Sequence, residues 1–492
     1  MPLQSVLPKG YRRNELSSRV DEAFELEDSN GVQRVQGKLA FTGLVTAGAI
    51  GILVAQYGVA SAWAFGLVAI TCAALYMFYR YPEFLLAIMF TTYYPLYWGL
   101  NLLGVLDTST ATTAWLAVAL VVMMLRFLTH ASAPYDRKAL AAFLLMTGII
   151  VGSWLWRSAI ADVSTYLTQF LWLLPLMVGP FCSGLTLDEG RVRRFVQFVI
   201  ALSVVFVLIV GMEALAGRGF VARTGRLTPF GGLFNPITTG YVLGYASSAS
   251  LPWVLAKRRP GLVAVWAMWF AVALILIILT GSRQALVLLV AAILLTLSAT
   301  YARRYRILGI ALVAAAVTLF GLLAFSATAE LQNGTPLQRF AQLLNDPIGQ
   351  GENRIARWAA AIKVAGDTAF LGGGFGASYG ATDNSGVHNV FLEALSDYGV
   401  LGVILLLFVH LRAMRLVWAT LLGENAPWWR HSVVVMYLTV LGGSLVSGRL
   451  TAVSNLWVAT GVILSLGPIG VAGGVSAGTS LVPQTQPAVP LK

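Results

Sequence analysis

Long apolar runs recur along almost the whole chain, and no other feature restricts its fold so strongly. They extend from Leu39 to Val471 and are interrupted by short polar or charged segments. A helix of about 20 residues, rising roughly 1.5 Å per residue, crosses a hydrocarbon core about 30 Å thick. Backbone groups inside that core must pair within the segment, which excludes open strands. We therefore predict an all-α, polytopic integral membrane protein.

The apolar runs predict about 12–14 transmembrane helices. With 58% hydrophobic and only 11% charged residues, the composition excludes an ordinary soluble enzyme. The predicted spans lie near residues 39–58, 60–79, 84–104, 113–129, 139–156, 163–184, 194–216, 236–256, 261–280, 284–300, 307–326, 388–410, 432–448 and 452–471.

The polar segments complete the predicted domain organisation. The mixed-charge N-terminus has no cleavable signal peptide pattern. We expect a cytoplasmic N-terminal tail (1–38), helices 1–11 (39–325), one large periplasmic loop (326–387), helices 12–14 (388–472) and a disordered cytoplasmic C-terminal tail (473–492).

Lysine and arginine placement supports a cytoplasmic N-terminus, because positive residues accumulate on cytoplasmic loops. With this orientation, 23 of the 33 basic residues fall on cytoplasmic segments, and the other ten are nine arginines and Lys363. Arginine holds oxyanions through a bidentate fork that lysine lacks. The arginines on the outer side therefore suggest an anionic ligand, although several of them would serve equally well as helix-end residues.

Two outer segments are longer than turns. Residues 217–235 combine three arginines with five glycines and Pro229. In the large loop, Thr335-Pro336 has the pattern of a helix start, and Ile355, Trp358, Ala359 and Ile362 have helical spacing. Arg354 and Arg357 share a neighbouring face of this second helix, and the LGGGFG turn at residues 371–376 follows it. Because no strand precedes the turn, it is not a dinucleotide-binding fingerprint.

One histidine stands on the predicted outer side, where the large loop meets the membrane. His388 is a candidate general base, with a polar helix-end role as the alternative. Glu393 and Asp397 follow inside the predicted span, where carboxylates are costly and are usually paired or functional. Cys72 and Cys182 fall in or at the end of apolar runs, so they suggest neither a disulfide framework nor a metal site.

Taken in order, these segments resemble the bacterial O-antigen ligase superfamily, which includes lipopolysaccharide O-antigen ligases, Wzy-type polysaccharide polymerases and protein O-oligosaccharyltransferases. The similarity covers roughly Arg226 to Gly402. It departs from the family pattern at Gln284, where a small residue is more usual, at Ile237-Thr238, and in the long N-terminal tail. The segments that carry it are Arg226 with GGLFNP, TGSRQAL at 280–286, Asn353-Arg354 with IARWAAA, LGGGFG, and His388-Asn389 with FLEALSDYGVLG.

The resemblance implies a GT-C-like glycosyltransferase of the inner membrane with its active site facing the periplasm. The donor would be an undecaprenyl-diphosphate-linked glycan, and the acceptor the lipid A core or another lipid-linked repeat. His388 would be the catalytic base, with Glu393 or Asn389 as candidate orienting residues. Neither a cofactor, a metal nor a nucleic acid is implied, and the net charge of +12 suits a protein among anionic lipids. The residues expected to bind the diphosphate and donor glycan are Arg226, Arg283, Arg354 and Arg357.

Several alternatives remain open at this stage. The sequence does not separate a polymerase from a ligase, and a protein O-oligosaccharyltransferase is a third member of the same group. A transporter or flippase of lipid-linked glycans would also be polytopic and basic. Such proteins usually place ionisable residues near the bilayer midplane and contain internal repeats. Here the arginines and His388 gather at one predicted edge.

Overall fold

The computed structural model describes part of the 492-residue chain. The described residues are 75–91, 108–130, 136–153, 173–220, 226–229, 236–301, 352–382, 386–423, 426–447, 450 and 454–466. Residues 75–77 belong to a compact unit formed by Met1–Met77, and all the elements below belong to a second unit, Phe78–Lys492.

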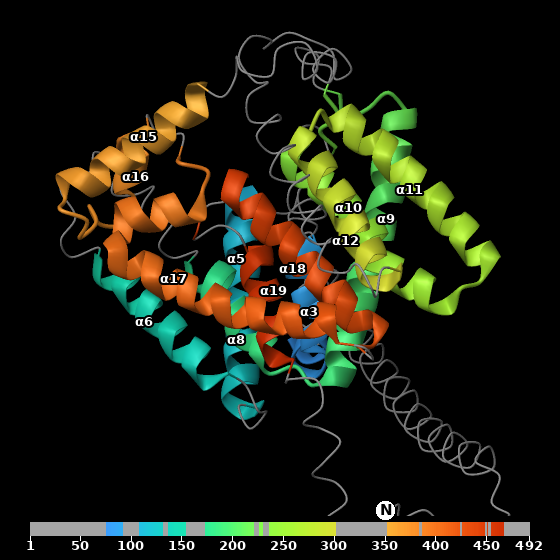
Figure 1. Ribbon diagram of the computed structural model, residues 1–492, viewed down its shortest axis with the longest axis horizontal. Coiled ribbons are helices and arrows are strands. Elements are labelled where there is room, and N and C mark those ends of the chain that lie inside the picture. Colours follow the sequence, from blue (N-terminus) through green and yellow to red (C-terminus); the bar gives the residue numbers. More distant parts are fainter. Residues whose placement is uncertain are drawn as a thin grey trace, which may run out of the picture. The chain divides into compact units, whose positions relative to one another are not determined.

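The second unit is built from helices (Figure 1). Within the described residues the only β-type pairing is an isolated bridge between Phe220 and Leu227. The all-α prediction is therefore confirmed for this part of the chain. The elements are α3 (Pro82–Thr91), α5 (Thr108–His130), α6 (Arg137–Ser153), a π-helical segment η2 (Leu174–Val178), α8 (Gly179–Leu185), α9 (Glu189–Leu215), α10 (Pro236–Lys257), α11 (Pro260–Thr280), α12 (Arg283–Tyr301), α15 (Glu352–Asp367), α16 (Ala377–Gly380), α17 (Val390–Leu422), α18 (Trp428–Ser447) and α19 (Ser454–Ser465).

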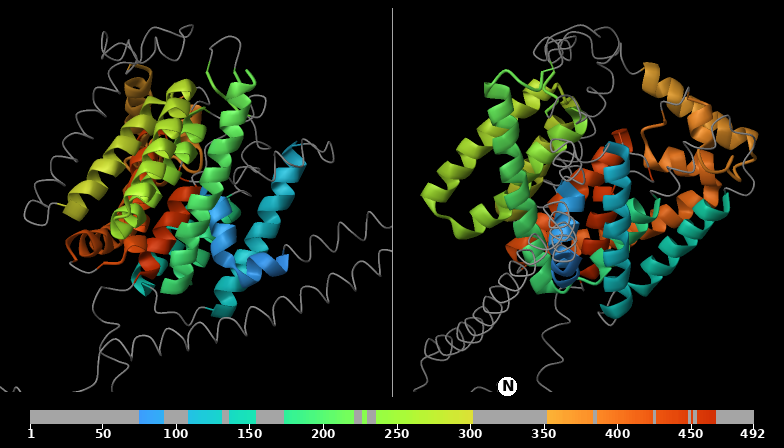
Figure 2. Two further views of the ribbon diagram at one scale, coloured as in Figure 1. Left: turned by 90° about the vertical axis from the view of Figure 1, so that its right-hand side faces the viewer. Right: turned by 180° about the vertical axis from the view of Figure 1, so that it is seen from behind.

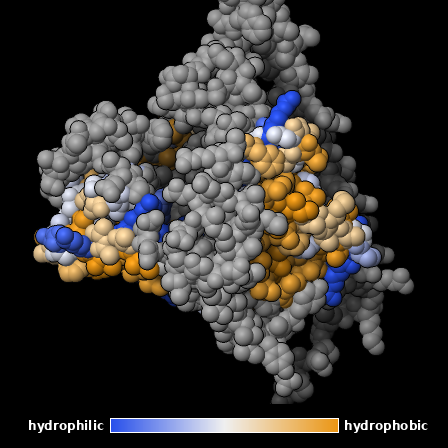
Figure 3. Space-filling model, turned by 90° about the horizontal axis from the view of Figure 1, so that it is seen from above, coloured by the Kyte–Doolittle hydropathy of each residue, from blue (hydrophilic) through white to orange (hydrophobic). Residues whose placement is uncertain are grey.

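Three of these helices, α9, α11 and α17, are long and apolar enough to cross a membrane. Apolar residues cover much of the described surface in Figure 3, and hydrophilic ones form small patches. On α11, Val265, Met268 and Ile275 are each more than half exposed. Exposed apolar side chains in this number suit contact with lipid and not with water.

The predicted spans agree closely with the observed helices over residues 194–301 and 432–448. The span predicted over 388–410 differs, because α17 extends to Leu422 and its backbone is not helical at Gly399. Several predictions fall outside the described residues: Cys72, the Thr335-Pro336 helix start, the spans at 39–58 and 307–326, both tails, most of the span at 60–79 and parts of five others.

Local sequence signals explain where the helices begin and end. The Asp188 carboxylate accepts the Arg191 amide at 2.8 Å and caps α9. Pro260 occupies the first turn of α11, where its missing N–H costs nothing. The same helix ends at Gly281, whose φ of 64° is left-handed and favours glycine. This turn separates α11 from α12 and forms one edge of the candidate site.

Small residues let the helices of the core approach closely, as is common in membrane proteins. A Cβ on Gly461 in α19 would lie 2.4 Å from the Phe181 carbonyl oxygen in α8. Beside this contact, the Phe181 ring stacks on Phe143 of α6 at 3.8 Å between centroids, and Trp457 packs edge-on against both rings. The core thus joins α6, α8 and α19.

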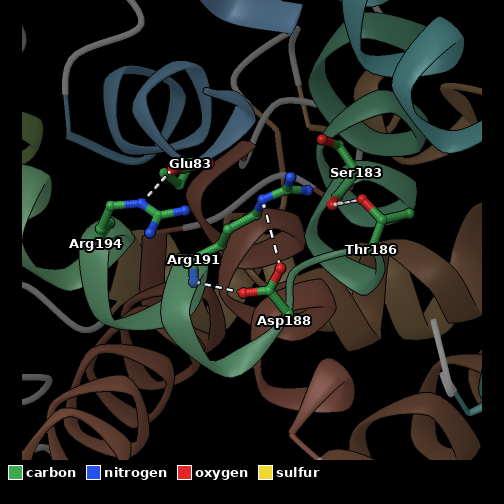
Figure 4. A network of polar contacts seen from close by, with 6 residues as sticks. All are labelled: Glu83, Ser183, Thr186, Asp188, Arg191 and Arg194. Atoms are coloured by element: carbon green, nitrogen blue, oxygen red, sulfur yellow. Dashed lines mark hydrogen bonds and ion pairs between the residues drawn. The ribbon is translucent and has the colours of Figure 1, made fainter. Parts of the chain in front are cut away.

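An ion pair joins α9 to α3, and a second one stabilises the start of α9 (Figure 4). The fully buried Glu83 of α3 accepts a hydrogen bond from Arg194 Nε at 2.7 Å. One turn earlier, Arg191 pairs with Asp188 at 3.5 Å. Figure 4 also shows Thr186, whose hydroxyl donates to the Ser183 carbonyl at 2.8 Å and closes the turn between α8 and α9.

Helix α10 is central to the remaining arrangement. It packs against α9, α11, α12 and α18, and Figures 1 and 2 show α10 and α12 side by side. Gly240 makes the approach possible, since a Cβ there would lie 2.7 Å from the Ala285 Cβ. The N-terminal turns of α10 and α12 are thereby held together.

Candidate active site

The helix predicted in the large loop exists as α15. The face that packs against the rest of the protein is not the one that carries the isoleucines. Arg354 and Arg357 are partly buried on the same face as Ala361 and Ala365, which are fully buried. Ile355 and Ile362, by contrast, are 54% and 51% exposed. The face carrying the two arginines is therefore the packed one, and α15 lies against α17.

Helix α17, which packs against α15, contains a sharp bend at Gly399. Its φ of 71° and ψ of −169° fall in a region that is essentially restricted to glycine. The LGGGFG turn lies directly on this bend. The Gly373 amide donates to the Ser396 carbonyl at 2.8 Å, and the Val400 amide donates to the Phe370 carbonyl at 3.0 Å. The turn thus fixes the direction of the first segment of α17, residues 390–398.

Asp397 anchors the same turn through its side chain. Its two carboxylate oxygens accept the amides of Gly376 at 3.0 Å and Ser378 at 2.8 Å, and the Ser396 hydroxyl donates to it at 3.2 Å. The residue is 2% exposed. This buried carboxylate therefore orders the backbone between α15 and α17.

Glu393 has a comparable backbone partner. Its carboxylate accepts the Leu450 amide at 2.8 Å, and the Leu450 carbonyl accepts the Trp457 indole N–H at 2.8 Å. These contacts tie the first segment of α17 to the residues before α19. Glu393 thereby supports the helix whose start follows His388.

His388 and Asn389 form the entry to α17. The Asn389 side chain accepts the amides of Phe391 and Leu392 at 3.0 and 3.1 Å, so it is the N-cap of the helix. The half-buried His388 has a φ of 57°, a left-handed conformation uncommon for residues other than glycine. The capped helix and the ordered turn hold this histidine in place.

Burial and two neighbouring positive charges lower the pKa of the His388 imidazole. Burial lowers its pKa below the ordinary 6.5, and the positive charges of Arg357 and Arg354 lower the pKa further. Arg354 itself has a lowered pKa, chiefly through burial, which the Tyr241 hydroxyl opposes and Arg357 reinforces. The structure thus brings His388, Arg354 and Arg357 within electrostatic range of one another.

Tyr241 of α10 is the member of this group that the sequence analysis missed. It lies within electrostatic range of Arg354. In the sequence, Tyr241 is marked only by its polar hydroxyl within a predicted span. Tyr245, one turn later, has the same feature, so the sequence does not distinguish the two tyrosines. The Tyr245 hydroxyl is already bonded to the Asn455 side chain at 2.9 Å.

Arg226, from the 226–229 segment, contacts the turn between α11 and α12, and Arg283 follows that turn. Arg226 Nε donates to the Thr280 carbonyl at 2.9 Å, and a Cβ on Gly281 would lie 3.3 Å from that nitrogen. Arg283 is the first residue of α12, and its side chain lies outside the described part of the structure. This turn adjoins α10, because a Cβ on Gly240 would lie 2.9 Å from the Ser282 Cβ.

The described part of the site therefore combines the His388 imidazole with the guanidinium groups of Arg354 and Arg357. Such a set can accept a proton from a hydroxyl and stabilise negative oxygens. Among the described residues, His, Cys, Asp and Glu form no group of three that could hold a metal ion.

Comparison with known proteins supplies one match. Residues 242–407 match the family model for O-antigen ligase, a range that includes Arg283, Arg354, Arg357 and His388. Searches of curated proteins and of solved structures find no match.

Proposed function

We propose that this chain, whose residues 242–407 match the family model for O-antigen ligase, is a GT-C-like glycosyltransferase of the bacterial inner membrane. It would transfer a glycan from an undecaprenyl-diphosphate donor to a sugar hydroxyl, with the active site facing the periplasm. The acceptor is the lipid A core if the protein is a ligase, and another lipid-linked repeat if it is a polymerase.

The diphosphate is the part of the donor that the arginines suit best. Its oxygens carry negative charge, which increases on the leaving oxygen as the bond to the sugar breaks. Arg354 and Arg357 lie on one face of α15, and Arg226 and Arg283 come from the 226–229 segment and the start of α12. Guanidinium groups placed in this way stabilise the developing charge without a metal ion.

In the proposed reaction, His388 removes the proton from the acceptor hydroxyl. The hydroxyl oxygen then forms a bond with the anomeric carbon while the bond from that carbon to the phosphate oxygen breaks. The electron pair leaves with undecaprenyl diphosphate, and the proton remains on the imidazole. A single displacement of this kind inverts the anomeric configuration.

The observation that carries this proposal is the placement of His388 beside two arginines that lower its pKa. A neutral imidazole is the form that accepts a proton, and the neighbouring charges favour it. The same arginines suit the diphosphate, so base and leaving-group contacts lie in one place. Asn389, Glu393 and Asp397 hold the surrounding backbone and support this arrangement.

The surface glycans of cells lacking the protein test the proposal. Accumulation of single lipid-linked repeats without polymer would identify a polymerase, whereas long lipid-linked polymer beside uncapped lipid A core would identify a ligase. Unchanged lipopolysaccharide and exopolysaccharide with loss of glycosylated proteins would indicate a protein O-oligosaccharyltransferase. Complementation by wild type but not by His388→Ala is expected. Equal complementation by both would reject the histidine mechanism and favour a transporter.

A further inference from the structure

Three buried polar atoms at the junction of α10, α12 and α18 have no hydrogen-bond partner among the described residues: the Tyr241 hydroxyl, the Ser282 hydroxyl and Gln284 Oε1. Most buried polar groups in proteins are paired, because an unpaired one has lost its hydrogen bonds to water without replacement. Ser282 is also 98% buried as a residue, with 2% of its surface exposed. Three such atoms in one junction suggest a ligand that supplies the missing hydrogen bonds.

The junction is organised around Gly443 of α18. The Gln284 side-chain amide nitrogen donates to the Gly443 carbonyl at 3.0 Å. A Cβ on Gly443 would lie 3.2 Å from the Tyr241 hydroxyl oxygen. The Tyr241 hydroxyl and the Gln284 amide therefore border the same glycine. Ser282 approaches the residue before Tyr241, because a Cβ on Gly240 would lie 3.1 Å from the Ser282 hydroxyl oxygen.

This junction adjoins the candidate active site. Arg354 lies within electrostatic range of the Tyr241 hydroxyl, and Arg354 in turn acts on His388. Ser282 and Gln284 flank Arg283 in the chain. The unpaired atoms thus belong to residues that adjoin Arg283 in the chain or lie within electrostatic range of Arg354.

The chemistry of Gln284 restricts what the ligand can be. Its amide nitrogen is committed to a carbonyl oxygen, so the free atom Oε1 must be the acceptor. An ionised diphosphate has only acceptor oxygens and cannot satisfy it. A sugar hydroxyl or an acetamido N–H can, and the Tyr241 hydroxyl can donate to or accept from the same sugar.

We propose that Tyr241 and Gln284 bind the first sugar of the donor, the one attached to the diphosphate, and help to select it. This inference rests on the proposed function and adds to it the part of the donor that these residues recognise. The lipid-diphosphate group remains with the arginines. Ser282 supports the junction from the α12 side.

The test compares two lipids bound to the purified full-length protein: undecaprenyl diphosphate carrying a single N-acetylhexosamine, and undecaprenyl diphosphate alone. Wild type should bind the sugar-bearing lipid more tightly. Tyr241→Phe and Gln284→Met should each reduce this preference by about three- to tenfold, the effect of losing one neutral hydrogen bond. Their affinity for the bare lipid should not change.

Tyr245→Phe is the matched control. It removes a hydroxyl one turn away on the same helix, but that hydroxyl is already bonded to Asn455. We expect it to keep the preference for the sugar-bearing lipid while losing thermal stability. Tyr241→Phe should be at least as stable as wild type, because it removes an unpaired buried hydroxyl. If Tyr241 had a purely structural role, Tyr241→Phe would lower thermal stability and leave the preference for the sugar-bearing lipid unchanged.

The outcomes separate the two proposals. If wild type prefers the sugar-bearing lipid and both variants keep the full preference, the inference about Tyr241 and Gln284 is wrong and the proposed function stands. If wild type binds neither lipid, the proposed function fails, and the inference fails with it.

Discussion

Gly372 and Gly399 meet backbone to backbone, with no space for a side chain on either residue. A Cβ on Gly372 would lie 2.5 Å from the Gly399 amide nitrogen, and a Cβ on Gly399 would lie 2.4 Å from the Phe370 carbonyl oxygen. This contact joins the turn after α15 to the bend in α17. It therefore places the two arginines of α15 relative to the helix that follows His388.

Gly399→Ala should destabilise this junction severely. The substitution adds a clash with the backbone to a conformation that only glycine adopts, so we expect a loss of at least about 3 kcal/mol. Thermal unfolding of the purified protein in detergent measures the effect. Gly366→Ala in α15 is the control, because a Cβ there meets nothing within 4 Å. An unchanged midpoint for Gly399→Ala would show that the bend is not required.

Asp397→Asn should lower stability by about 1–3 kcal/mol, the usual cost of a buried group left without its partner. The carboxylate accepts two backbone amides, and an asparagine would place its own N–H₂ group against one of them. Thermal unfolding again provides the measurement. Asp367→Asn, an exposed change at the end of α15, should have no effect. Equal midpoints for the two variants would contradict the anchoring role of Asp397.

Arg357→Gln should move the acidic limb of the kcat/KM profile to higher pH. The Arg357 charge lowers the pKa of His388, so its removal raises that pKa towards 6.5. Protonation then inactivates the base at a higher pH than in wild type. Lys363→Gln, an exposed change on the same helix, should leave the limb in place. A limb that stays in place for Arg357→Gln, or moves to lower pH, would contradict the assignment.

His388→Gly should change stability and activity in opposite directions. The left-handed backbone at His388 suits glycine, so we expect a gain of about 1 kcal/mol in stability. Glycan transfer should be lost together with the imidazole. His388→Ala loses transfer as well but keeps the backbone strain, so it separates the two effects. A less stable glycine variant would show that the imidazole contributes to folding more than the strain costs.

The sequence predicted the parts of the site that depend on local patterns. Helix α15, its two arginines on one face and the turn after it all follow from residue spacing. The N-cap role of Asn389, which the sequence suggested only as an orienting residue, comes from the structure. The resemblance to the O-antigen ligase superfamily is confirmed by the family model that matches residues 242–407.

The features that the sequence did not predict depend on contacts between distant segments. The bend at Gly399 depends on Gly372, 27 residues earlier, and an isolated glycine in an apolar run gives no sign of such a contact. The packed face of α15 is set by Ala361 and Ala365, not by its isoleucines. Tyr241 and Tyr245 are alike in the sequence, and only their partners distinguish them.

Glycan transfer by purified His388→Ala tests the account most directly. The assay uses an undecaprenyl-diphosphate-linked glycan with an acceptor from the same cells, and it measures donor binding in parallel. We predict that transfer falls by about 10²–10⁴-fold, the usual contribution of a general base, while the donor still binds to the arginines. Transfer at the wild-type rate would contradict the account.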